Sequence, residues 1–204
     1  MTGHRLSEVP IGFDYSVQYD GLIFDCDGTL TDSMPLHFVA WRDTMTLYGI
    51  EFAEDRFYSM AGMPSDQIIG ILSGEQQVRV DIDAAAEKKE AAFATMIDRL
   101  QSKDDVCQVA RSHHGRLPMA VASGGIRPIV DQQLVKIGVR NLFDAIVTAE
   151  DTTKHKPEPD VFLLAADLLG ISPNRCVVFE DSPLGFTAAE RAGMAWVDVR
   201  SGCE

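Results

Sequence analysis

Residues 21–30 read Gly-Leu-Ile-Phe-Asp-Cys-Asp-Gly-Thr-Leu, a short apolar run that stops at two aspartates. An apolar run of this length, bounded by polar residues, predicts a strand that is buried on both faces. The following residues, up to Pro35, are polar and include glycine, which predicts a loop. We therefore expect Asp25 and Asp27 to lie on a loop at the carboxyl end of a buried strand.

The chain beyond residue 105 alternates between short apolar runs and helical stretches of ten or so residues. The runs at 119–122, 145–148, 176–179 and 196–199 predict four further strands. Strands that alternate with helices indicate βαβ units and a parallel sheet. The predicted fold class is therefore α/β, with a doubly wound, Rossmann-like parallel sheet that carries helices on both faces.

Residues 35–104 interrupt this pattern after the first strand. They contain stretches of helical spacing and strong helix formers, at 36–48 and 83–100, and no strand pattern. We therefore expect a helical insert in an otherwise continuous core. The predicted division is an N-terminal extension of residues 1–19, an α/β core of residues 20–34 and 105–204, and a helical domain of residues 35–104.

The charge balance and the cysteines limit the possible partners. Lys and Arg total 18 against 31 Asp and Glu, so the formal net charge is −13, and no basic patch suited to nucleic acid or to an anionic membrane is visible. The four cysteines are scattered, and the first twenty residues lack the apolar stretch of a secretory signal. We expect a cytoplasmic monomer with no nucleic-acid partner and no membrane partner.

Chemically active side chains follow the predicted strands. Ligands of open α/β sheets bind at the carboxyl ends of the strands, so residues after each strand meet at one edge. Carboxylates, hydroxyls and a lysine are expected there: Asp25, Asp27, Thr29, Ser123, Lys156, Glu180 and Asp181.

This set of groups indicates phosphoryl transfer. Neighbouring carboxylates repel one another unless a cation lies among them, and an oxygen-only ligand set suits Mg²⁺. The lysine and backbone amides would hold a phosphate, and an aspartate can attack it to form an aspartyl-phosphate. The spacing of His113, His114 and His155 suits a metal site no better than that of the carboxylates, so these histidines are expected at the surface.

The same residues resemble the motifs of a known superfamily. Residues 25–30 resemble the signature of the haloacid dehalogenase-like (HAD) superfamily, and Ser123, Lys156 and the pair 180–181 match its further motifs in order. Residues 156–160 and 178–185 resemble the β-phosphoglucomutase-like branch. Residues 113–121 and 154–157 are similar to small bacterial sugar phosphatases of the fructose-1-phosphatase type. The resemblance covers roughly residues 20–200.

The resemblance implies a role for each matched residue. Asp25 would be the nucleophile, and Asp27 would protonate the leaving alkoxide and then activate water. The Mg²⁺ ligands would be Asp25, the backbone carbonyl of Asp27, Asp181 directly, and Glu180 directly or through water. The transferring phosphoryl group would be held by Ser123, Lys156 and the Gly124 amide.

The insert resembles the helical cap that closes over the core in this branch and selects the substrate. His37 matches a hinge histidine, and Lys89 aligns with a cap lysine that contacts substrate. Mutases of the branch carry an arginine in the loop near Gly62, which grips a second phosphate, whereas Ser65 stands there in this chain. Without that arginine the bisphosphate intermediate should be held poorly, and water should take the phosphoryl group in place of the sugar. A phosphatase is therefore favoured over a mutase.

The resulting prediction is a Mg²⁺-dependent phosphomonoester hydrolase that acts on a small phosphorylated metabolite, a sugar phosphate. Two alternatives stay open. One is a β-phosphoglucomutase-like mutase, which would interconvert sugar phosphates without releasing phosphate. The other is a non-catalytic binding protein on the same fold, which would have no need of a second aspartate at position 27. The sequence leaves open which sugar phosphate is the substrate and what residues 1–19 do.

Overall fold

The core of the molecule is a parallel sheet of six strands. The computed structural model describes residues 3–6 and 13–200. The strand order is β1-β6-β5-β2-β3-β4, and every neighbouring pair is parallel. The strands are β1 (His4–Arg5), β2 (Gly21–Phe24), β3 (Met119–Ala122), β4 (Ala145–Val147), β5 (Cys176–Glu180) and β6 (Ala195–Asp198). The predicted fold class is confirmed.

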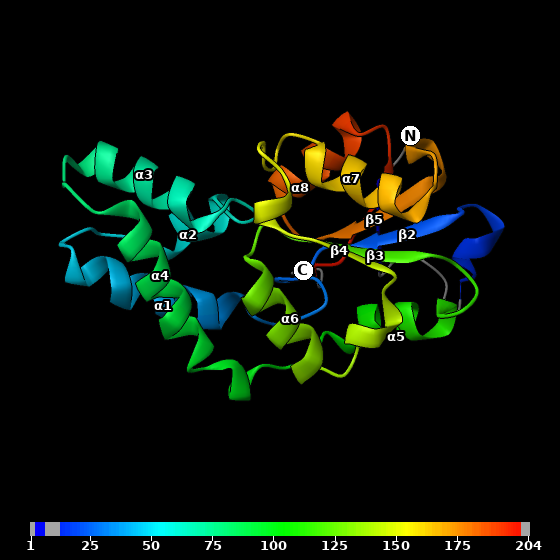
Figure 1. Ribbon diagram of the computed structural model, residues 1–204, viewed down its shortest axis with the longest axis horizontal. Coiled ribbons are helices and arrows are strands. Elements are labelled where there is room, and N and C mark those ends of the chain that lie inside the picture. The colour runs from blue at the N-terminus through cyan, green and yellow to red at the C-terminus, as the bar shows by residue number, and fades with distance from the viewer. Residues whose placement is uncertain (1–2, 7–12, 201–204) are drawn as a thin grey trace.

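Helices cover both faces of this sheet (Figure 1). One face packs against α5 (Asp104–His113) and α6 (Arg127–Lys136), and the other against α7 (Asp160–Leu169) and α8 (Pro183–Arg191). Successive residues of β2 therefore face different clusters: Leu22 and Phe24 join the first and Ile23 the second. Burial on both sides explains why the strand is apolar throughout instead of alternating.

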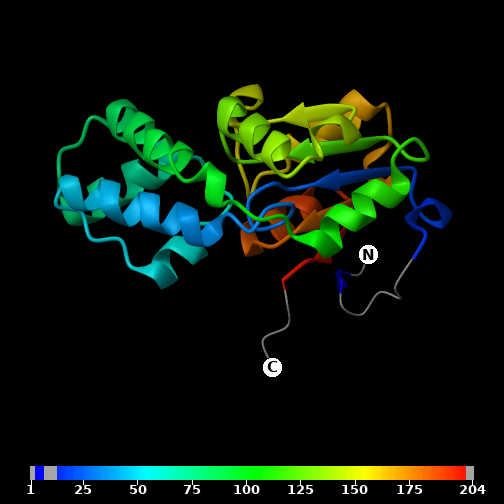
Figure 2. The same ribbon diagram turned by 90° about the horizontal axis from the view of Figure 1, so that it is seen from below.

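The insert forms a helical bundle beside the sheet, which we call the cap (Figures 1 and 2). It consists of α1 (Met34–Leu47), α2 (Glu54–Ser59), α3 (Ser65–Gln76) and α4 (Ile82–Ala94), followed by a 3₁₀ turn at Ile97–Arg99. The cap has its own apolar cluster, which includes Trp41, Met45 and Phe57. The sequence did not predict α2, and the single helix expected at 83–100 ends at Ala94.

The two linkers between the cap and the core run side by side. The Asp32 N–H donates to the Gln101 carbonyl at 2.9 Å, and the Lys103 N–H donates to the Leu30 carbonyl at 2.9 Å. Thr31 forms an antiparallel bridge with Ser102 between these bonds. Both linkers between the core and the cap therefore lie next to the loop that follows β2.

Part of the N-terminal segment packs onto the core. β1 adds to the edge of the sheet by pairing with β6, and Tyr15 is buried in the apolar cluster. The Tyr15 N–H donates to Nε2 of His113 at 3.1 Å. His113 is consequently only 2% exposed, so the expected surface position of this histidine is wrong.

Cys26, Cys107 and Cys176 are buried free thiols, whereas Cys203 lies outside the described residues. In residues 3–6 and 13–200, no helix has both the length and the apolar character needed to cross a membrane.

Candidate active site

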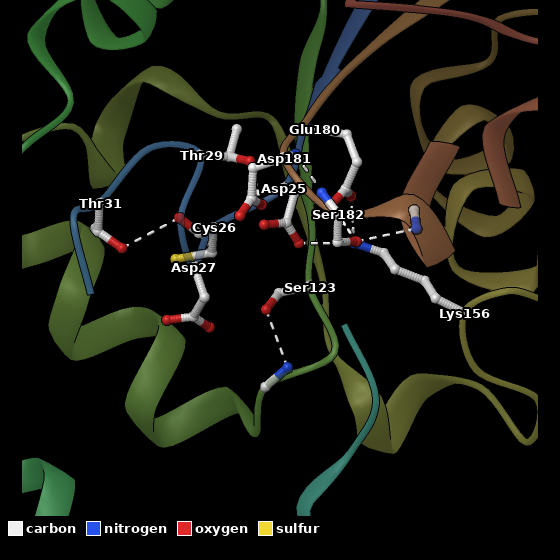
Figure 3. A network of polar contacts seen from close by, with 12 residues as sticks. Asp25, Cys26, Asp27, Thr29, Thr31, Ser123, Lys156, Glu180, Asp181 and Ser182 are labelled. Atoms are coloured by element: carbon white, nitrogen blue, oxygen red, sulfur yellow. Dashed lines mark hydrogen bonds and ion pairs between the residues drawn. The ribbon is translucent and has the colours of Figure 1, made fainter. Parts of the chain in front are cut away.

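Three carboxylates lie together at the carboxyl ends of β2 and β5 (Figure 3). Phe24 pairs with Phe179 across these neighbouring strands, so Asp25, the first residue after β2, lies beside Glu180, the last residue of β5. Asp181 follows directly. One oxygen atom of each carboxylate lies within 4.8 Å of the others.

Burial of Asp25 and Asp181 disfavours their ionised forms. Burial, and next the charge of Glu180, raises the pKa of Asp25 well above its usual range. The same two causes raise the pKa of Asp181 to about 7. A cation among the three would relieve this cost, so the chemistry of the donor set fits a hard divalent metal such as Mg²⁺.

Lys156 supplies a positive charge beside the cluster. Its Nζ donates to Asp25 Oδ1 at 2.7 Å and to Glu180 Oε2 at 2.8 Å (Figure 3). Burial alone would lower the pKa of Lys156, but the charges of Asp25 and Glu180 outweigh it and raise that pKa. The ammonium group therefore stays charged and fixes the orientation of both carboxylates.

The hydrogen bonds distinguish the three carboxylates as metal ligands. Glu180 Oε1 accepts from the Asp181 N–H, the Ser182 N–H and the Ser182 hydroxyl, and its Oε2 is occupied by Lys156. Among the described residues, Asp25 Oδ2 and Asp181 Oδ2 have no hydrogen-bond partner. Asp25 and Asp181 thus have free oxygens for a cation, while Glu180 orients its neighbours.

Asp27 lies on the same loop as Asp25 but has a different environment. Its Oδ1 accepts from Ser33 Oγ at 2.7 Å, His37 Nε2 at 2.8 Å and Gln133 Nε2 at 2.9 Å. Although burial favours the protonated form, these interactions hold the pKa of Asp27 below its usual range. Its Oδ2 has no partner among the described residues and is free to exchange a proton with a substrate or a water.

His37 connects Asp27 to the cap. Its ring stacks on Phe93 with centroids 3.7 Å apart, and its Nδ1 lies 3.1 Å from Lys89 Nζ. Burial, and next the charge of Lys89, lowers the pKa of His37. A neutral imidazole with its proton on Nε2 satisfies both contacts, because it donates to Asp27 and accepts from Lys89.

Ser123 and Gly124 follow β3 and complete the core side of the site. The buried Ser123 hydroxyl accepts from the Gly125 N–H at 3.0 Å. A Cβ atom on Gly124 would lie 2.4 Å from the carbonyl oxygen of Gly62, which belongs to the cap. The cap therefore touches the core at this point, and only glycine leaves room for the contact.

A pocket lies between the cap and the core, with about 640 Å³ of space outside the protein atoms, part of it open to solvent. The core contributes Asp25, Asp27, Ser123, Gly124, Glu180 and Asp181 to its lining, and the cap contributes His37, Ser65 and Lys89. Lys156 is not among the lining residues and lies behind Asp25. Sequence reasoning missed Ser33 and Gln133, which hold Asp27. Ser33 lies just before α1 and Gln133 lies on α6, and isolated polar residues in such places carry no recognisable signal.

Comparison with known proteins agrees with this geometry. The family model for haloacid dehalogenase-like hydrolases matches residues 22–199. The chain belongs to this family. The match spans both halves of the core and the cap between them, so it includes every residue of the pocket described above.

Relatives of this haloacid dehalogenase-like hydrolase include phosphatases of phosphorylated sugars. Fructose-1-phosphate phosphatase YqaB of Escherichia coli (strain K12) is 41% identical over 184 residues, 90% of this chain and 97% of that protein. A phosphorylated carbohydrates phosphatase of Thermotoga maritima is 27% identical over 179 residues, 86% of this chain and 82% of that protein. The crystal structure of a β-phosphoglucomutase from Clostridium difficile superposes with a TM-score of 0.81 at 23% identity, covering 90% of this chain and 85% of the other, which shows a shared fold.

Proposed function

We propose that this protein is a Mg²⁺-dependent phosphomonoester hydrolase that acts on a sugar phosphate through an aspartyl-phosphate intermediate. The observation that carries the proposal is the pair of aspartates on one loop, each with one oxygen held by the protein and one oxygen without a partner. One carboxylate can attack while the other transfers a proton. The relatives named above, which act on phosphorylated sugars, support the substrate class.

In the first step, Asp25 Oδ2 attacks phosphorus and the ester P–O bond breaks. The hydrogen bonds to Oδ1 keep Asp27 ionised in the free protein, so Oδ2 takes up a proton when the negatively charged phosphate ester binds beside it. The leaving alkoxide then takes this proton from Asp27 Oδ2, which acts as a general acid. Lys156 keeps Asp25 oriented through Oδ1 during the attack. Ser123 and the Gly124 amide support the equatorial phosphate oxygens, where charge is concentrated.

In the second step, Asp27 Oδ2 takes a proton from a water molecule. That water attacks phosphorus, the bond between phosphorus and Asp25 breaks, and inorganic phosphate leaves. The hydrogen bonds that lower the pKa of Asp27 support this step, because they favour the ionised form that can accept a proton.

Asp181 would hold the magnesium ion through its free Oδ2 and Asp25 through Oδ1, which leaves Asp25 Oδ2 for the attack on phosphorus. The Asp27 backbone carbonyl would add a ligand, and Glu180 would act through water. When bound, Mg²⁺ neutralises phosphate charge and polarises the phosphoryl group. We further propose that residues 35–104 act as the lid of the site and that residues 20–34 and 105–204 form its base. The contact between Gly62 and Gly124 supports a closed arrangement of the two.

We also propose that the protein works in the cytoplasm as a monomer. The buried free thiols support a reducing compartment. The most exposed apolar side chains, which belong to four different elements, support a monomer: Val17, Leu47, Val135 and Leu168.

The test is phosphate release from a panel of sugar phosphates, with Mg²⁺ or with EDTA. We expect Asp25→Asn to lower the rate by more than about a thousandfold. Asp167→Asn, an exposed aspartate on α7, is the matched control and should behave as the wild type. Full activity of Asp25→Asn would refute the proposal, and interconversion of sugar phosphates without phosphate release would favour the mutase.

A further inference from the structure

Glu90 is a buried carboxylate on the cap side of the pocket and has no part in the chemistry proposed above. It lies on α4 next to Lys89, and both residues line the pocket together with Ser65, the first residue of α3. Glu90 is 9% exposed and Lys89 is 3% exposed. Such burial is rare for a glutamate unless its charge is paired.

The contacts of Glu90 use only one of its oxygens. Oε1 accepts from the Ser65 hydroxyl at 2.6 Å and from Lys89 Nζ at 3.0 Å. Oε2 has no hydrogen-bond or ion-pair partner among the described residues, and it is not sealed from solvent. The pocket therefore contains a rigidly held carboxylate with one free acceptor oxygen.

Without Glu90, this corner would favour an anion. In the part of the chain that the structure describes, Lys89 is the only lysine or arginine that lines the pocket. A serine hydroxyl and the start of a helix, where the helix dipole attracts negative charge, lie beside it. Glu90 neutralises the charge of Lys89 and accepts the hydrogen bond of the Ser65 hydroxyl. The protein's own carboxylate therefore uses the two groups that would otherwise bind a phosphate.

We propose that Glu90 determines specificity by rejecting a second phosphate and accepting a neutral, hydroxyl-bearing group on the cap side of the pocket. The substrates are then monophosphates of polyhydroxylated compounds, and bisphosphates are excluded. A substrate hydroxyl donates to Oε2, whereas a phosphate there meets the like charge of a largely buried carboxylate. This inference rests on the proposed phosphatase function and narrows its substrate class.

The test compares two ligands that differ by one phosphate group, fructose 1-phosphate and fructose 1,6-bisphosphate. Glu90→Gln keeps the shape of the side chain and its acceptor oxygen, so that only the charge is lost. The matched control is Glu87→Gln, an exposed glutamate on the same helix. The quantity to measure is the ratio of kcat/KM for the monophosphate to that for the bisphosphate, from phosphate release with Mg²⁺.

We expect Glu90→Gln to lower this ratio at least about tenfold through improved use of the bisphosphate, because a like-charge contact is removed. Glu87→Gln should leave the ratio at the wild-type value. An unchanged ratio in Glu90→Gln would overturn the proposal.

Calorimetric binding of both ligands to the Asp25→Asn protein, with and without Glu90→Gln, gives the same comparison without turnover. If the wild type releases no phosphate from any sugar phosphate, the proposed function fails, and the ratio of dissociation constants still decides the role of Glu90. A binding ratio that Glu90→Gln leaves unchanged would overturn that role.

Discussion

Removal of the metal should make the stability of this protein fall as pH rises from 4 to 7, and Asp181→Asn should remove the part of that fall that Asp181 contributes. In the folded, metal-free protein, burial and the charge of Glu180 raise the pKa of Asp181 from 3.8 to about 7. An unfolded chain loses this proton near pH 4. Between the two values the folded state binds more protons than the unfolded state, so a rise in pH favours unfolding.

The size of the effect follows from the shift in pKa. One pKa unit corresponds to about 1.4 kcal/mol, so the contribution of Asp181 to the free energy of unfolding should drop by about 4 kcal/mol in full and by about 3 kcal/mol between pH 5 and pH 8. His37 acts in the opposite direction, because its pKa is lowered and protonation below pH 6.5 favours the unfolded chain. Asp25 acts in the same direction as Asp181, because burial and the charge of Glu180 raise its pKa too. The contributions of His37 and Asp25 are present in both proteins, so the comparison of the wild type with Asp181→Asn isolates that of Asp181.

The assay is urea denaturation of both proteins in EDTA at pH 5 and pH 8. Relative to Asp181→Asn, the wild type should lose about 3 kcal/mol between the two pH values. Saturating Mg²⁺ should restore most of this loss in the wild type, because a cation favours the ionised carboxylate. Equal pH dependence of the two metal-free proteins would refute the electrostatic account of the cluster.

Three further substitutions test other parts of the site and the core. Asp27→Asn should lower the rate of phosphate release about 10²- to 10⁴-fold, the usual contribution of a general acid, with far-UV circular dichroism unchanged. Gly124→Ala should prevent the cap from closing and lower kcat/KM at least about tenfold, whereas Gly74→Ala, which meets nothing within 4 Å, should retain activity. His113→Ala should leave the Tyr15 N–H unpaired and cost about 1–3 kcal/mol in urea denaturation, and an unchanged midpoint would contradict this role.

The core of the site could be predicted because it depends on local patterns and one topological rule. The apolar run before Asp25 identifies a buried strand, and parallel strands bring their carboxyl ends to one edge. The register of β2 with β5 then places Asp25 beside Glu180, as the sequence pattern indicated. These steps need no knowledge of side-chain contacts.

Other features depend on contacts between distant segments, which leave no local pattern. Gln133 bonds to Asp27 across 106 positions of sequence, and Ser65 bonds to Glu90 across 25. The two residues of β1 form a strand only because they pair with β6 at the edge of the sheet. The short helix α2 begins after Ala53, whose side chain cannot cap it, so the usual signal of a helix start is missing.

The adjacent linkers have a consequence for how such a protein can be rebuilt. Because Leu30 and Lys103 are joined by a hydrogen bond of 2.9 Å, the core chain leaves and returns at almost the same point. A short turn could close that gap at little entropic cost, and an unrelated module with neighbouring termini could be grafted there without straining the sheet. The cap could therefore be exchanged for another module while the sheet and the loop after β2 keep their structure.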